Sequence, residues 1–189
     1  RNPEDGAEAV YVEATPENVA SGDYAIARPF NIAYKADSLS ATAQDFINWI
    51  LSAEGQAIVT AQKYVAKEPA EYQAAPVAGK IVIGGSSSVG PLMQKLEEAY
   101  EELHPEVDIE VQISDSSTGM HGAADGSFDI GMASREVKAS ELEAGLTPVP
   151  ICMDGIAVIV NNDNAVEGLT LNQIRDIFTG EIVDWDEVK

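Results

Sequence analysis

Residues 84–91, Gly-Gly-Ser-Ser-Ser-Val-Gly-Pro, join a short apolar run to an amphipathic segment. The apolar run, residues 81–83, predicts a strand, and the segment that begins at Pro91 predicts a helix. The first N–H groups of a helix lack intrahelical partners and lie at the positive end of its dipole. Because glycine and serine leave room beside these N–H groups, the loop predicts a corner that can bind an anion.

The same loop fits only the first half of a nucleotide-binding P-loop. Gly85 and Gly90 have the required spacing, but Pro91 and Leu92 stand where that motif needs a lysine and a hydroxyl residue. In a P-loop, that lysine contacts the terminal phosphates and that hydroxyl residue binds the magnesium ion. Nucleotide hydrolysis is therefore not expected.

The chain of 189 residues carries 32 acidic residues against 11 lysines and arginines, a formal net charge of -21. A chain of this length is expected to form one well-packed domain or two small ones. Its charge repels nucleic acids and anionic membrane surfaces, which bind basic patches. A bound anion must therefore be held by local N–H and O–H groups rather than by a pool of positive charge.

The single cysteine, Cys152, lies in an apolar run, which predicts a buried thiol rather than a reactive one. One cysteine cannot form an intramolecular disulfide or a zinc cluster, and the sequence predicts no metal and no cofactor. No apolar run is long enough to span a bilayer. The chain begins at Arg1 without a signal-peptide pattern, as expected of a mature or excised segment.

Beyond residue 80 the predicted elements alternate between strand and helix. They are a strand at 81–83, a helix at 91–103, a strand at 109–113, a short helix after Ser116 and a strand at 128–132. This βαβαβ order predicts an α/β fold with a parallel sheet. Loops at the carboxyl ends of such strands converge, so residues 86–89, 114–119 and 133–136 are expected to meet.

The remaining segments supply further elements. They are a strand at 28–34, helices after Ser40 and after Gly55, a linker between residues 65 and 80, a strand at 155–160 and a helix at 171–178. Thr170 and Gln173 form a capping box for the last helix, and Gly180 ends it. His104 is expected at a helix end because proline follows it, and His121 on an exposed helix face.

Two hydroxyl-rich loops that face one cleft can hold a tetrahedral oxyanion, and Asp129 is expected near the same edge. An ionised carboxylate only accepts hydrogen bonds, so it selects an anion that still carries a proton, as hydrogen phosphate does and sulfate does not. Plainer alternatives stay open. The serines are equally expected as helix caps, Asp129 as a strand-edge residue, and Arg135 as a partner of Asp129 or Glu136 in a surface ion pair.

Several motifs together resemble the phosphate-binding proteins of ABC transporters. They are Gly-Ser-Ser-Ser-Val at 85–89, residues 112–120, Phe-Asp-Ile-Gly at 128–131 followed by Ser134 and Arg135, Asp-Gly-Ile-Ala-Val-Ile-Val-Asn at 154–161, and residues 177–185. Residues 80–189 resemble the amino-terminal part of one lobe of such a protein. Residues 1–66, with Arg-Pro-Phe at 28–30, resemble the carboxyl-terminal part of the same lobe.

The resemblance implies an α/β fold, as a single lobe of the type II periplasmic-binding-protein class. It implies a central, mostly parallel sheet of about five strands with helices on both faces. Both segments would pack as one domain, joined by a linker at 67–79, in an order that is permuted relative to the family. The second lobe is expected to be absent, so the chain would be a cut from a tandem array or an engineered single lobe.

The resemblance implies a phosphate site with several hydrogen-bond donors and one hydrogen-bond acceptor. The donors are Ser87, Ser88 and Ser116, with Ser86, Ser117 and Thr118 as secondary candidates, and the acceptor is Asp129. Asp115 stands where the family has glycine, and its charge would weaken anion binding unless it points outward. The opposite lobe's Arg-x-x-Gly-Ser-Gly-Thr motif does not occur in the chain, so weak binding is expected.

The implied function is phosphate binding for an ABC transporter, in an extracytoplasmic location and without catalysis. The implied partners are inorganic phosphate, a second lobe or another copy of this one, and the transporter permease, with no nucleic acid. Two other classes stay open. A ligand-free interaction or adhesion module is favoured by the acidic surface and by Asp115. An enzyme would use a serine of residues 86–88 with His104 or His121 as base, but Gly-x-Ser-x-Gly does not occur there.

Overall fold

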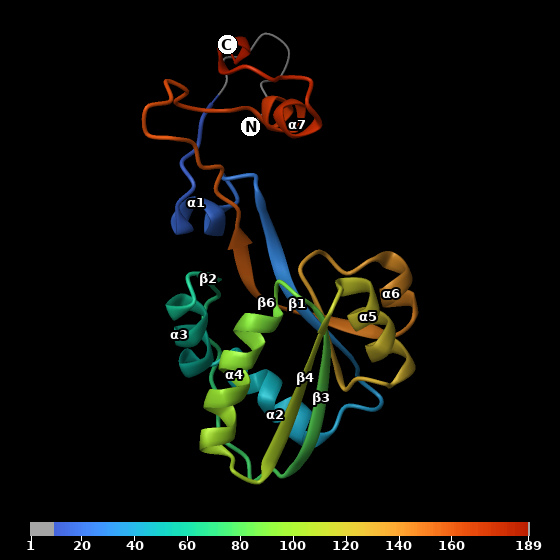
Figure 1. The fold of residues 1–189 in the computed structure, drawn as a ribbon. Coiled ribbons are helices and arrows are strands. Elements are labelled where there is room, and N and C mark those ends of the chain that lie inside the picture. The colour runs from blue at the N-terminus through green and yellow to red at the C-terminus, as the bar shows by residue number, and fades with distance from the viewer. Residues whose placement is uncertain (1–9, 189) are drawn as a thin grey trace. The chain divides into compact units, whose positions relative to one another are not determined.

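The computed structural model describes residues 10–188, which divide into two compact units (Figure 1). One is Arg28–Asp154, which we call the sheet unit. The other, the terminal unit, consists of the described residues of Arg1–Ala27 and Gly155–Lys189. Each unit contains residues from both predicted segments, so the packing of these segments as one lobe stays a prediction.

A six-stranded sheet in the order β2-β6-β1-β5-β3-β4 organises the sheet unit. Its strands are β1 (Ala27–Lys35), β2 (Val65–Ala66), β3 (Gly79–Ser86), β4 (Val107–Ser114), β5 (Ile130–Ala133) and β6 (Leu146–Gly155). β3 pairs in parallel with β4 and β5, whereas β5 pairs antiparallel with β1, and β6 with β2. The α/β class is confirmed, but the sheet is mixed and larger than expected. A helical crossover makes two successive strands parallel. β1 lies before the linker and is not joined to β5 by such a crossover, so it can pair antiparallel with β5.

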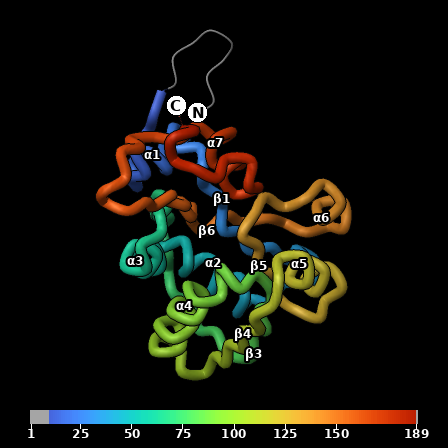
Figure 2. Tube along the Cα trace, turned by 45° about the horizontal axis from the view of Figure 1, so that its top comes forward, coloured from blue at the N-terminus to red at the C-terminus, as the bar shows by residue number. Residues whose placement is uncertain are grey.

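Helices cover both faces of this sheet, as predicted (Figures 1 and 2). They are α2 (Ala41–Ile50), α3 (Ala53–Ala61), α4 (Gly90–Leu103), α5 (Ser116–Asp125) and α6 (Ala139–Glu143). Successive side chains of a strand point to opposite faces. Ile130 and Met132 of β5 accordingly join the core with residues of α2 and α4, whereas Ala133 joins a second core with residues of α5.

Polar side chains begin the helices of the sheet unit. Ser40 accepts a hydrogen bond from the N–H of Ala43 at the start of α2, as predicted. Ser52 caps α3, so this helix begins before Gly55 rather than after it. His104 ends α4, which confirms its predicted position. β3 and β4 are longer than predicted, because the glycine and polar residues at their ends still pair.

The predicted linker has no helix or strand between β2 and β3, and a buried carboxylate holds it in place. Asp45 of α2 accepts hydrogen bonds from the hydroxyl groups of Tyr72 in the linker (2.8 Å) and Tyr100 of α4 (2.6 Å). Burial and this carboxylate raise the pKa of both phenols.

Cys152 is buried in the same core, as predicted, and burial raises its pKa to about 12.

The terminal unit contains α1 (Pro16–Ser21), α7 (Leu171–Thr179) and the 3-10 helix η1 (Trp185–Glu187). α7 has the predicted capping box of Thr170 and Gln173, and Gly180 ends it in the left-handed conformation. Across residues 10–188, no helix is long and apolar enough to cross a membrane.

The strand predicted at residues 155–160 is wrong. β6 ends at Gly155, and no helix or strand follows until α7. The apolar run after Gly155 suggested a buried strand, but Ile159 is 89% exposed. Pro148 and Pro150 concealed the real strand, because proline seldom lies inside a sheet.

Candidate functional site

Three loops meet at one edge of the sheet, where β3, β4 and β5 end. Parallel pairing sets Ser86 opposite Ser114 and Gly85 opposite Met132, so the last residues of the three strands lie level. Polar residues follow each strand at this point. The predicted meeting of the three loops is therefore confirmed, and we call this region the carboxyl edge.

In the first loop, between β3 and α4, two backbone N–H groups donate to oxygens of the protein and are not open to a ligand. The N–H of Ser87 donates to the carbonyl of Ser114 (3.1 Å), and the N–H of Ser88 donates to the hydroxyl of Ser86 (3.3 Å). Ser86 is buried, Ser88 is half-buried and Ser87 is exposed. Within residues 10–188 the hydroxyl groups of Ser87 and Ser88 have no hydrogen bond, so both can donate to a ligand.

The second loop carries a carboxylate at the start of α5. Asp115 accepts hydrogen bonds from the N–H groups of Ser117 (2.8 Å) and Thr118 (3.1 Å) and from the Thr118 hydroxyl (2.6 Å). The Thr118 hydroxyl contributes most to lowering the pKa of Asp115, and the two N–H groups add to it. The carboxylate is exposed and occupies the N–H groups that the sequence assigned to an anion.

Ser116 connects α5 to the end of β5. Its hydroxyl accepts a hydrogen bond from the N–H of Ser134 (3.2 Å). The Ser134 hydroxyl in turn lies 3.5 Å from Nη1 of Arg28, at the beginning of β1. Arg28 donates through Nε to Asp154, at the end of β6, over 2.9 Å. These four residues form one continuous chain of polar contacts, which we call the edge cluster.

Arg135, next to the edge cluster in sequence, is engaged by an internal ion pair. Its guanidinium donates to both carboxylate oxygens of Glu141 in α6, at 2.9 and 2.7 Å. These bonds raise the pKa of Arg135 and lower that of Glu141. The suggested ion pair with Asp129 or Glu136 is wrong, because α6, which the sequence did not predict, brings Glu141 within reach.

Asp129 lies at the opposite end of β5 from the carboxyl edge. Its carboxylate accepts a hydrogen bond from the N–H of Val82 (2.7 Å), in the middle of β3. Val82 precedes Ser86 by four residues, which is about 13 Å along a strand. The expectation that Asp129 lies near the predicted donors is therefore wrong, because β5 begins only at Ile130 and runs from there toward the edge.

Two glycines allow α5 to approach the sheet closely. A Cβ at Gly119 would lie 2.6 Å from the Cα of Gly85 and 2.8 Å from the carbonyl oxygen of Met132. Gly85 also has a φ of +134°, which residues with side chains rarely adopt. The absence of side chains at these two positions thus determines where Ser116 and Asp115 lie at the carboxyl edge.

Arg28, Ser134 and Asp154 were not among the site residues predicted from the sequence. Each stood in a motif that carries the family resemblance, and this was the only available signal. They lie close together because β1 is between β5 and β6 in the sheet. That neighbourhood cannot be read from hydrophobic periodicity, which reports the faces of a strand and not its partners.

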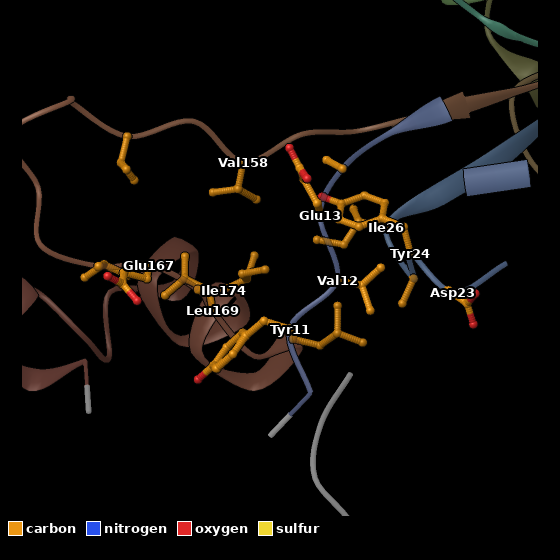
Figure 3. A pocket seen from close by; sticks show the side chains of 16 residues that line it. Tyr11, Val12, Glu13, Asp23, Tyr24, Ile26, Val158, Glu167, Leu169 and Ile174 are labelled. Carbon is orange, nitrogen blue, oxygen red and sulfur yellow. The ribbon is translucent and has the colours of Figure 1, made fainter. Parts of the chain in front are cut away.

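The terminal unit has a cavity of about 610 Å³ (Figure 3). Apolar side chains from residues 11–26 and 158–174 form much of its wall. Its charged lining residues are Glu13, Asp23 and Glu167, and no basic residue lines it. An acidic cavity repels anions. In the described part of the chain, no group of histidine, cysteine or acidic residues is arranged to hold a metal ion.

A family model described as a PBP superfamily domain matches residues 70–189. The chain belongs to the PBP superfamily. A phosphate-binding protein, PstS 2 of Streptococcus agalactiae, is 48% identical over 176 residues, which cover 93% of this PBP chain and 60% of that protein. A crystal structure of a phosphate-binding protein of a phosphate ABC transporter from Streptococcus pneumoniae has a TM-score of 0.88 and 40% identity, and the match covers 94% of this chain and 69% of that one.

The resemblance to phosphate-binding proteins is thereby confirmed, and the PBP chain spans about 60% of the length of the Streptococcus agalactiae relative. That match of 176 residues is longer than residues 80–189, so it includes both predicted segments in the order found here. The PstS of Pseudomonas aeruginosa, at 37% identity, matches over 117 residues, 58% of this chain and 36% of that protein. The order of the two segments is therefore shared with streptococcal relatives.

Proposed function

We propose that this PBP chain is part of the phosphate-binding protein of an ABC transporter and binds hydrogen phosphate at the carboxyl edge. The names of its relatives support this role, and they support binding rather than catalysis. The observation that carries the proposal is the meeting of hydroxyl-bearing residues from three strand ends at one edge. A tetrahedral anion has oxygens for several such donors.

Ser87, Ser88 and Ser116 are the proposed principal donors. The hydroxyl protons of Ser87 and Ser88 are available. The Ser116 hydroxyl accepts from Ser134, which leaves its own proton for a ligand. The secondary candidates lie in the same loops. Ser86 is buried, the Thr118 hydroxyl donates to Asp115, and the N–H of Ser117 is paired with Asp115.

The two histidines also support binding rather than catalysis. His104 lies at the last turn of α4, 3.3 Å from the Tyr72 hydroxyl, whereas the serine loop precedes the first turn. His121 is 82% exposed and faces Asp125 of its own helix. Across residues 10–188, neither histidine contacts a serine of the first loop, so no nucleophile and base are paired there.

Binding by this chain alone is proposed to be weak. A two-lobed binding protein closes around its ligand and removes water from it. Here the donors approach from one side, and Ser87 is exposed, so a bound anion would keep part of its hydration. Further donors would come from the part of the PBP fold that this chain does not span.

The terminal unit is proposed to dock against that remaining part. Among residues 10–27 and 155–188, Val19 is the only buried apolar side chain. Ile159, Phe178 and Val183 are 89%, 81% and 84% exposed. Folded proteins seldom leave so many large apolar side chains uncovered together, so these residues fit a core that is completed by the part of the PBP fold outside this chain. The transporter permease and an extracytoplasmic location are proposed on the family membership alone.

Isothermal titration with phosphate, arsenate and sulfate tests the proposed function. We expect heat with phosphate and a thermal midpoint that rises with phosphate concentration. The double variant Ser87→Ala/Ser88→Ala should bind phosphate about tenfold more weakly, because hydrogen bonds to a charged group are lost. Ser127→Ala, at the other end of α5, is the control. A thermal midpoint that phosphate never changes would favour the ligand-free interaction module instead, the reading that Asp115 supports.

A further inference from the structure

The edge cluster contains a cation, Arg28, and a carboxylate, Asp154. The proposed function, which relies on serine donors, gives neither of them a role. The chain has a formal net charge of -21, so a cation beside a doubly charged anion would offset part of the surrounding repulsion. Arg135 is held by both oxygens of Glu141. Arg28 is in contact with the hydroxyl of Ser134 and is the cation that the edge cluster provides.

Arg28 has donors left for a ligand. A guanidinium carries five N–H donors in a planar fork, and the bond to Asp154 uses Nε alone. Nη1 also donates to the Ser134 hydroxyl, so one N–H of Nη1 and both of Nη2 stay available. The side chain is 36% exposed, so an anion in water can reach it. The guanidinium lies 5.7 Å from the ring centre of Phe30, and this contact helps to fix its orientation.

Asp154 has a carboxylate oxygen left to accept a hydrogen bond from the same ligand. Oδ2 receives the bond from Arg28, while Oδ1 has no hydrogen bond within residues 10–188. The side chain is 18% exposed. An ionised carboxylate has no proton to donate, so it attracts the O–H of a protonated anion and repels an oxygen without a proton.

We propose that Arg28 and Asp154 form the charged part of the anion site. Arg28 donates hydrogen bonds to oxygens of the anion, and Asp154 accepts a hydrogen bond from the O–H of hydrogen phosphate. The inference rests on the proposed function and gives the reason for its selectivity. It transfers to Asp154 the acceptor role that the sequence had given to Asp129.

The other two carboxylates do not fit this role. Both oxygens of Asp115 are occupied by the N-terminus of α5. Asp129 is bonded to Val82, about 13 Å along β3 from the carboxyl edge. Asp154 is joined to the edge serines through Arg28.

Titration of Asp154→Asn with phosphate and with sulfate tests the inference. The amide can donate a hydrogen bond where the carboxylate could only accept one. We expect phosphate binding to weaken about tenfold or more and sulfate binding to strengthen, so the ratio of the two affinities should fall by more than about tenfold. A residue that only supported the fold would lower both affinities together. Glu141→Gln breaks the other arginine–carboxylate pair with the same change of charge, and it should keep the ratio.

An unchanged ratio in Asp154→Asn, with phosphate still bound, would overturn the inference and leave the proposed function intact. If the wild-type chain binds neither anion, the proposed function itself fails. Should circular dichroism show that Asp154→Asn does not fold, Arg28→Lys provides the second test. Lysine keeps the charge but loses the planar fork, so phosphate affinity should fall about tenfold. Unchanged phosphate affinity in that variant would also overturn the inference.

Discussion

At the scale of single residues, Asp115 takes the place that the sequence assigned to an anion. Its carboxylate pairs with the N–H groups of Ser117 and Thr118 at the start of α5. Helix N-termini favour negative charge, so this contact stabilises the helix. The same carboxylate adds negative charge beside the carboxyl edge. Helix stability and anion affinity are therefore opposed at this residue.

Asp115→Asn should tighten phosphate binding about twofold to tenfold, because it removes one negative charge beside the site. Asparagine caps helices as well as aspartate does, so the free energy of unfolding should change little. Calorimetry and urea unfolding measure the two effects. Asp125→Asn makes the same change about 15 Å away along α5, where salt screens the charge, and should leave affinity unchanged. Weaker binding by Asp115→Asn would mean that the carboxylate helps to hold the ligand.

Glu141 should make the free energy of unfolding of the sheet unit depend on pH. Hydrogen bonds from Arg135 lower the pKa of this carboxyl in the folded protein. The pair therefore stabilises the fold fully above the unfolded-state pKa, and this stabilisation is lost as pH falls through the folded-state pKa. The difference in free energy of unfolding between wild type and Glu141→Gln should shrink as pH is lowered from about 7 to about 3. Urea unfolding across this range measures it, and a difference that stays constant would contradict the prediction.

At the scale of elements, α5 depends on close contact with the sheet through glycine. Gly119→Ala should lower the free energy of unfolding by about 1–3 kcal/mol, because the added methyl group meets backbone atoms that cannot move aside. His121→Ala, on the exposed side of the same helix, should change it by less than about 0.5 kcal/mol. Urea unfolding compares the two. Equal effects would mean that α5 does not pack as tightly as described.

The linker between β2 and β3 depends on the buried carboxylate of Asp45. Tyr72→Phe should destabilise the protein by about 1–3 kcal/mol, because Asp45 loses one of its donors. It should also speed proteolysis within the linker, since this bond connects the linker to α2. Tyr34→Phe is a matched control, because the Tyr34 hydroxyl has no hydrogen bond within residues 10–188. If protease cleaves the linker of Tyr72→Phe no faster than that of the wild type, the prediction is wrong and other contacts hold the linker.

At the scale of the whole molecule, the two units differ in how much apolar surface they bury. The sheet unit has two buried cores, whereas α7 of the terminal unit has no buried residue. Segments with few buried apolar contacts open at little cost in free energy. Amide hydrogen exchange should therefore be slow in α4 and fast in α7, as followed by mass spectrometry of the chain. Equally slow exchange in both helices would contradict the proposal that the terminal unit needs the remaining part of the PBP fold to complete its core.

The sequence by itself determined several local elements and the place where polar loops gather. Ser40, Thr170 and Gly180 act on N–H or carbonyl groups a few residues away, so their roles are visible in short stretches of sequence. The apolar period of α4 is equally local. The glycine and serine loop after β3 predicted the carboxyl edge because the carboxyl ends of parallel strands meet.

Only the tertiary structure decided which charged groups belong to that edge. Arg28 lies 126 residues from Asp154 and 106 from Ser134, and they meet because β1 lies between β5 and β6. Asp129 is excluded for a related reason, since the first paired residue of β5 places it at the other end of the strand. Strand order and register depend on contacts between distant segments. A local pattern of residues reports which side of a strand is buried, but not which strand lies beside it.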